Sequence, residues 1–305
     1  MCQSDVPQAY RFDDGVDPEE LTSKERKARR RREYPPAPEP LPRPLIDNHT
    51  HLSMRPHLAQ VTASQAMDAA EAVGVTRAVQ VSFDLDSARF TRDAVEAEPR
   101  LLGAVAIHPN DAAELGAEGT LDAAIAEIEE IAEHPRIRAL GETGLDFFRT
   151  GPEGVAAQEH SFREHIRIAE KLGKAVQIHD RDAHEDVVRI LEDTRPSVPV
   201  VFHCFSGGPE LARICNERGW RMSFSGTVTF NNSTELQEAL SIARKDLILT
   251  ETDQPFLTPH PYRGQPNATY MTPVTARFMA EHLGMDLGEL CDTVCANTEA
   301  VYGQW

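Results

Sequence analysis

The sequence predicts an α/β protein built as a TIM-type (β/α)8 barrel, and two observations carry this prediction. Short apolar runs that suit strands alternate with segments of helical periodicity from residue 44 onward, a length close to the roughly 250 residues of such barrels. Five of these runs end on a side chain that can bind a metal ion. Barrel strands end at one common face, where these side chains would meet. A doubly wound open sheet remains possible, but it brings five strand ends to one centre less easily.

The strands and helices follow from the pattern of apolar residues in chain order. Short apolar runs bounded by polar or turn residues indicate strands. Between them, apolar side chains recur at three- and four-residue spacing, as at Leu121, Ile125 and Ile128, which places them on the one helix face that packs on a sheet. The predicted strands are 44–49, 77–82, 102–107, 137–141, 174–179, 198–203, 220–225 and 246–250.

Residues 1–43 differ in composition from the rest and are predicted to form a disordered arm before a barrel domain at 44–305. A basic cluster at 24–32 is followed by a proline-rich stretch at 35–42, which is typical of a stiff, extended spacer. Such a run is more often a solvated tail than a tether for a nucleic acid or a protein partner. Both interpretations stay open.

The chain is acidic, with a net charge of −18 from 49 Asp and Glu against 31 Lys and Arg. This charge repels polyanions at long range and argues against a tight, non-specific grip on long duplexes. No apolar run approaches the roughly 20 residues that cross a bilayer, and the start lacks a signal-peptide pattern. We therefore expect a cytoplasmic protein with no membrane association and no obligate protein partner.

The first and fourth predicted strands end in candidate metal ligands. His49 and His51 lie two residues apart, so both imidazoles point to the same side of an extended segment and can hold one ion. Alone, such a pair could be incidental. Glu142 ends the fourth strand inside a glycine turn, where its carboxylate could bridge two cations or cap a helix.

Three further strands also end in possible ligands. His179 and His203 each follow an apolar strand, where a buried imidazole without a partner would be costly, so each is a ligand or a hydrogen-bonded core residue. Asp253 supplies the last carboxylate, in a turn held by Pro255. Together these four imidazoles and two carboxylates predict two divalent cations per chain that share Glu142. Zinc, manganese, iron and nickel suit such mixed ligands, and magnesium suits them less obviously.

The chain resembles the TatD-related metal-dependent hydrolases of the amidohydrolase superfamily over residues 44–303. The resemblance rests on D-N-H-T-H-L at 47–52, G-E-T-G-L-D-F-F at 141–148, I-H-D-R-D-A at 178–183, V-F-H-C-F-S-G at 201–207 and L-T-E-T-D-Q-P-F-L-T-P at 249–259. It implies that one metal is held by His49, His51 and Asp253, the other by His179 and His203, and that Glu142 touches both.

The candidate catalytic residues are Asp253 and Glu142. Paired cations lower the pKa of a shared water, and Asp253 could orient that water and take its proton. A phosphodiester suits this chemistry, because its transition state needs its charge neutralised more than it needs covalent help. The candidates for holding a phosphate are His108, Arg181, Tyr262 and Arg263. The guanidinium of an arginine can donate two parallel hydrogen bonds to two phosphate oxygens. A salt bridge to a neighbouring acid is the alternative role that stays open for both arginines.

The resemblance implies a deoxyribonuclease that acts on 3′ ends, and the acidic surface favours DNA ends or a small phosphorylated substrate over long duplexes. Two other functions stay open. An amidohydrolase that cleaves a cyclic amide or a nucleobase C–N bond would use the same activated water. A non-catalytic scaffold would instead bind a partner through its basic arm.

Overall fold

The predicted barrel is confirmed by the computed structural model, which describes residues 5–11, 15–16, 21–54 and 61–305. Eight strands pair in parallel in strict chain order from β1 to β8. Backbone hydrogen bonds from Asp253 N to His49 O (3.0 Å) and from His51 N to Gln254 O (3.1 Å) join the segment after β8 to β1. The strands are β1 (Leu45–Thr50), β2 (Val75–Val81), β3 (Leu101–Val105), β4 (Ile137–Asp146), β5 (Ala175–Arg181), β6 (Val200–Phe202), β7 (Arg221–Phe224) and β8 (Ile248–Thr250).

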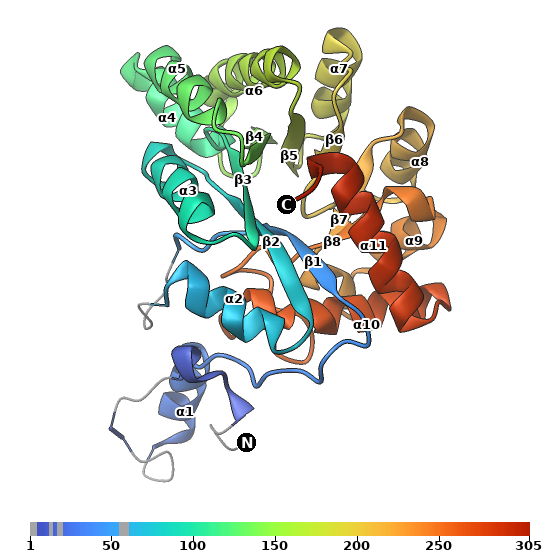
Figure 1. Ribbon diagram of the computed structural model, residues 1–305. Helices are drawn as coiled ribbons and strands as arrows, with labels where there is room; N and C mark the ends of the chain where they lie inside the picture. The colour runs from blue at the N-terminus through green and yellow to red at the C-terminus, as the bar shows by residue number, and fades with distance from the viewer. Residues whose placement is uncertain (1–4, 12–14, 17–20, 55–60) are drawn as a thin grey trace.

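Helices surround the sheet on the outside, as Figure 1 shows. Leu121, Ile125 and Ile128 are buried on one face of α5, against the strands. The helix predicted from their spacing is therefore confirmed. The outer helices are α2 (Ala63–Glu71), α3 (Leu85–Ala97), α4 (Pro109–Glu118), α5 (Leu121–Ala132), α6 (Pro152–Leu172), α7 (His184–Thr194), α8 (Pro209–Arg218), α9 (Thr234–Ile242), α10 (Thr272–Leu283) and α11 (Leu287–Tyr302).

The inside of the barrel is filled by small and branched side chains. One core cluster includes Val79, Leu102 and Val201, which point inward, and it is separate from the larger cluster between sheet and helices. The C-terminal Trp305 packs on this inner cluster, and its indole N–H donates to the carbonyl of Arg100 at 2.9 Å. Because Arg100 immediately precedes β3, Trp305 covers the amino ends of the strands. Figure 1 shows the C terminus at the centre of the ring of strands. The functional groups therefore gather at the other end.

The structure differs from the expectation of a disordered arm in the described part of residues 1–43. The basic cluster forms α1 (Ser23–Arg30), which begins with a capping box between Thr22 and Glu25. Tyr34 follows α1 and is buried, with its ring 4.9 Å from that of Tyr10. Tyr10 lies 5.1 Å from Tyr270 of the barrel. Composition indicated disorder because charge and proline dominate the segment, but two aromatic rings are enough to dock it.

Hydrogen bonds tie the arm to the barrel along its length. Tyr270 donates its hydroxyl to Pro35 O at 2.7 Å, and the side-chain amide of Gln265 donates to Glu33 O at 3.0 Å. The proline-rich stretch then runs without helix or strand to β1, as the sequence indicated. Within the described residues, no helix combines the length and the apolar character needed to cross a membrane.

Candidate metal centre and active site

A cavity of about 570 Å³ opens at the carboxyl ends of the strands. It is lined by residues from the ends of β1, β4, β5 and β6 and from the segment after β8, which is where chemistry is located in barrels of this type. All six predicted metal ligands lie in or beside this cavity, and the structure brings them together in two adjoining clusters.

The first cluster joins β1 to the segment after β8. The Nε2 atoms of His49 and His51 lie 3.0 Å apart, and Asp253 Oδ1 is 3.6 Å and 3.3 Å from them. Oε2 of Glu142 lies 3.7 Å from His49 Nε2 and 3.5 Å from His51 Nε2. The other nitrogen of His51, Nδ1, is 2.9 Å from the carbonyl of Val81, which fixes the tautomer with the Nε2 lone pair pointing into the cluster.

The second cluster forms around the other oxygen of the same carboxylate. Oε1 of Glu142 lies 2.6 Å from His179 Nδ1 and 2.9 Å from His203 Nε2. His108 Nε2 lies 3.6 Å away on the cavity side. Glu142 thus faces both clusters, one with each oxygen, as a bridging ligand must.

These clusters suit divalent cations. Imidazole nitrogens and carboxylate oxygens are the common ligands of zinc and related transition metals. Three groups of ligand atoms lie within 4.8 Å of one another: His49 with Glu142 and His203, His49 with His51 and Asp253, and His108 with Glu142 and His179. The two facing imidazole nitrogens of His49 and His51 need a cation or a proton between them.

Burial and neighbouring charges set the protonation of the bridge. Burial alone would raise the pKa of Glu142, but His203, His108 and His179 outweigh it and hold this pKa well below its usual value. Glu142 is therefore an anion. Burial, together with the nearby His179, lowers the pKa of His108 to about 3, so its ring is neutral at pH 7.

His108 lines the cavity next to the second cluster. Its Nδ1 accepts a hydrogen bond from the backbone N–H of Asn110 at 3.2 Å. In a neutral ring the proton then sits on Nε2, which points at the cavity as a donor. That His108 binds substrate stays a prediction.

The predicted phosphate-binding residues are only partly brought together. Arg181 lines the cavity, and its guanidinium lies 4.0 Å from the centre of the Phe148 ring. Tyr262 and Arg263 lie on the segment after β8 and are not among the residues that line the cavity; Arg263 packs over Phe230 at 4.4 Å. Within the described residues, neither arginine forms a salt bridge. The alternative that Arg181 pairs with a neighbouring acid is therefore not supported.

The site depends on buried acids to which the sequence reasoning gave no role. Glu251 Oε1 lies 3.0 Å from Nδ1 of His203 and accepts the N–H of Cys204 at 2.7 Å. Asp47 accepts from the N–H and the hydroxyl of Thr252 at 2.9 and 2.6 Å. Both acids stand two positions before a predicted ligand on an extended segment, and this period of two is the signal that could have found them.

Asp146 is a third such acid, and it links a ligand to the cavity wall. Its Oδ2 lies 3.2 Å from Nε2 of His179, while its Oδ1 accepts the N–H groups of Phe148 and Arg149 at 3.0 and 2.8 Å. Burial would raise the pKa of Asp146, but these hydrogen bonds hold it below its usual value.

The strand that carries Glu142 and Asp146 depends on one glycine. Gly144 has φ +137°, and a Cβ there would collide with the carbonyl oxygen of His179. Because Gly144 has no Cβ, its backbone can approach that of His179, and β4 pairs with β5 beyond Glu142. The segment predicted as a glycine turn is therefore part of the strand.

Comparisons with known proteins agree with this geometry. A family model described as TatD related DNase matches residues 46–303. An uncharacterized metal-dependent hydrolase of Mycobacterium tuberculosis, TatD, is 39% identical over 263 residues, which are 85% of this chain and 98% of that protein. YabD of Bacillus subtilis, another uncharacterized metal-dependent hydrolase, is 33% identical over 260 residues, with coverage of 85% and 98%.

The barrel also resembles a solved structure. The crystal structure of YJJV, a TatD homologue from Escherichia coli, superposes with a TM-score of 0.79 at 20% identity and covers 86% of this chain and 98% of that one. The family match covers all eight strands except the first residue of β1, and it includes every predicted metal ligand. This chain therefore belongs to the TatD-related family of metal-dependent hydrolases.

Proposed function

We propose that this chain is a phosphodiesterase of the TatD type, a deoxyribonuclease that removes nucleotides from 3′ ends of DNA with two divalent cations per chain. The observation that carries the proposal is the orientation of Glu142, whose two oxygens face two separate groups of imidazoles. A site for a single metal would need only one of these two groups of imidazoles.

When bound, two cations would supply hydroxide near neutral pH and a clamp for the oxygens of the group under attack. The residues of the chain supply the rest. Asp253 is held by its backbone N–H, which donates to His49 O at 3.0 Å, and it has a φ of +55°, an uncommon value for a residue other than glycine. Such strain is found at functional sites, and here it aims a carboxylate into the cavity, where it can orient a water and accept its proton.

Two neutralising or donating groups face the space above the clusters. Arg181 keeps its guanidinium free of acidic partners within the described residues, so its fork can bind two phosphate oxygens. The Nε2–H of His108 is the second donor. With a net charge of −18 the protein lacks the positive surface for a long duplex, which supports an end of a strand as the substrate.

Cleavage of a labelled single strand by the metal-loaded protein tests the proposal, with metal content measured on protein purified without chelators. Glu142→Gln and Asp253→Asn should each lower the rate by at least about a hundredfold, as expected when a charged group that acts in the transition state is removed. Asp193→Asn, on the exposed face of α7, is the matched control and should cleave like the unaltered protein.

Two results would contradict the proposal. Equal cleavage by Glu142→Gln and the unaltered protein would show a contaminating nuclease. Hydrolysis of a cyclic amide such as a dihydropyrimidine, with no action on DNA, would establish the amidohydrolase alternative instead.

A further inference from the structure

Two phenylalanines at the mouth of the cavity are exposed to solvent. Phe148 and Phe256 are 63% and 50% exposed, and the other large apolar side chains exposed within the described residues are aliphatic. Single exposed apolar residues are common on protein surfaces and need no explanation. Here, however, both exposed aromatic rings are associated with the cavity: Phe256 lines it, and Phe148 lies over Arg181, which lines it too.

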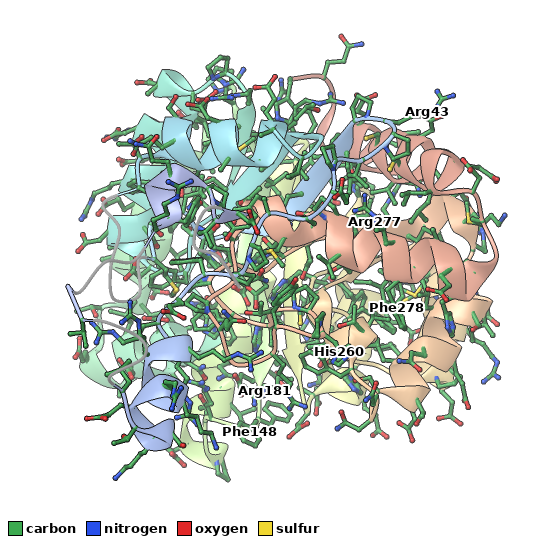
Figure 2. The ribbon with its side chains drawn as sticks, turned by 90° about the horizontal axis from the view of Figure 1, so that it is seen from below. Arg43, Phe148, Arg181, His260, Arg277 and Phe278 are labelled. Atoms are coloured by element: carbon green, nitrogen blue, oxygen red, sulfur yellow. The ribbon has the colours of Figure 1, made fainter. Side chains whose placement is uncertain are left out.

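Phe148 and Arg181 lie at the functional end of the barrel. Figure 2 shows them together at its lower edge, whereas Arg43, which precedes β1, lies at the opposite edge. Arg181 ends β5 two residues after His179, so both side chains leave the strand on the same side. The ring that covers this guanidinium is therefore close to the second cluster of ligands.

Both phenylalanines are held in place by hydrogen bonds to residues of the site. The backbone N–H of Phe148 donates to Asp146 Oδ1 at 3.0 Å, and Asp146 contacts His179 through its other oxygen. The backbone N–H of Phe256 donates to Asp253 O at 2.8 Å. These rings are thus presented to solvent by a fixed backbone, and their exposure is not that of a loose loop tip.

The two phenylalanines follow strands on opposite sides of the barrel. Phe148 follows β4 and Phe256 follows β8, and these strands lie four places apart in the eight-strand order. The cavity lining combines charged side chains, such as Asp146, Arg149 and Arg181, with apolar ones, such as Phe83 and Leu257. Two separate aromatic rings flanking a charged cavity do not form the contiguous apolar patch that a protein partner would cover.

We propose that Phe148 is a stacking platform for a nucleobase next to the scissile phosphodiester, and that Phe256 contacts the neighbouring base from the opposite wall. Arg181 lies behind the Phe148 ring, where its cation–π contact fixes the ring while its remaining donors face the phosphate. Stacking accepts any base, because every base has a π-face, and it requires bases that are unpaired. The proposal rests on the proposed nuclease function and narrows its substrate to single-stranded ends that carry bases.

The test compares two labelled single strands that are identical except that the last two 3′ nucleotides of one lack their bases. The unaltered protein should cleave the base-bearing end with a kcat/KM about tenfold higher, the change that corresponds to one stacked base. Phe148→Ala should slow cleavage of the base-bearing end about tenfold and leave the abasic end unchanged. Phe148→Trp should retain the preference, and Ile242→Ala, which removes an exposed apolar side chain on α9, should not alter it.

A binding measurement separates this inference from the nuclease function itself. A strand ending in 2-aminopurine should change its fluorescence on binding in EDTA, where no cleavage occurs, and Phe148→Ala should remove that change. Equal slowing of both ends by Phe148→Ala, or no effect on either, would overturn the stacking role. If the unaltered protein cleaves neither strand, the nuclease proposal fails; the 2-aminopurine signal still decides whether the ring binds a base.

Discussion

Glu251 holds His203 from behind: its Oε1 lies 3.0 Å from Nδ1 of the imidazole, whose Nε2 faces Glu142 at 2.9 Å. The same Oε1 accepts the N–H of Cys204 at 2.7 Å, so one buried carboxylate fixes both the ring and the backbone next to it. Burial raises the pKa of Glu251, against the opposing effect of His203. A carboxylate that contacts one nitrogen of a metal-binding imidazole orients the ring and makes its other nitrogen a stronger ligand for the metal.

Glu251→Gln should therefore weaken divalent-metal binding about 10- to 100-fold, the usual cost of losing a partner of a ligating histidine. The amide keeps the shape of the side chain but not its charge. Calorimetric titration of metal-free protein with zinc or manganese measures the effect. Glu238→Gln, an exposed acid on α9, should bind metal like the unaltered protein; unchanged affinity in Glu251→Gln would show that His203 does not need this partner.

Thr252 supports the site through Asp47, which accepts hydrogen bonds from its N–H and its hydroxyl. Burial raises the pKa of Asp47 to about 8, against the effect of these bonds, so the carboxyl depends on its few partners. Thr252→Val removes the hydroxyl and should lower the free energy of unfolding by about 1–3 kcal/mol, the cost of an unsatisfied buried polar group. Urea unfolding measures it. Thr252→Ser keeps the hydroxyl and should retain most of the stability; if Thr252→Val is as stable as the unaltered protein, the hydroxyl does not contribute.

Much of the site could be predicted from sequence because its ligands end strands. In a parallel barrel the chain order of strands fixes which ends converge, so His49 and Asp253 meet although two hundred positions separate them. For the buried acids, a period of two marks Asp47 and Glu251 as candidates, but it does not say which side chains they contact. Glu251 and Asp146 gain their roles from neighbours at the ends of other strands, His203 directly after β6 and His179 on β5, and no local pattern names those partners.

Two local errors have physical causes. Gly144 suggests a turn, but its positive φ lets β4 continue against β5 as far as Asp146. Charge and proline suggest disorder in the arm, but Tyr10 and Tyr34 bury their rings against Tyr270 and dock it. In both cases the local composition predicted one structure, but a contact with a distant part of the chain stabilises another.

His165 should make the stability of the barrel depend on pH. Its ring is buried in α6, where Nε2 accepts the N–H of Ile107 at 3.2 Å and Nδ1 lies 2.7 Å from Ser161 O. Burial lowers its pKa to about 4 from the ordinary value of 6.5. Between these values the unfolded chain binds a proton that the folded one excludes. The stabilising contribution is therefore complete above pH 6.5 and is lost as the pH falls toward 4, by about 3 kcal/mol.

His165→Gln should flatten the fall in unfolding free energy between pH 6.5 and 4, because glutamine does not titrate. Urea titrations at several pH values, compared between variant and unaltered protein, isolate this contribution from that of other groups. His160→Gln, on the exposed face of the same helix, is the control and should keep the original slope. An identical slope in His165→Gln would mean that the ring is protonated in the folded state.

Tyr34 should anchor the N-terminal arm to the barrel. Its ring is buried against Tyr10, and the adjoining carbonyls of Glu33 and Pro35 accept hydrogen bonds from Gln265 and Tyr270. Tyr34→Ala removes a buried aromatic side chain and should cost about 2–4 kcal/mol of unfolding free energy, with faster proteolysis within residues 21–33. Lys27→Arg, exposed on α1 and still a cleavage site for trypsin, should change neither. Thermal unfolding and limited trypsin digestion provide the readouts. If Tyr34→Ala is as stable and as resistant as the unaltered protein, the Tyr34 ring is not the anchor, and the hydrogen bonds from Gln265 and Tyr270 to the backbone of the arm hold it without this ring.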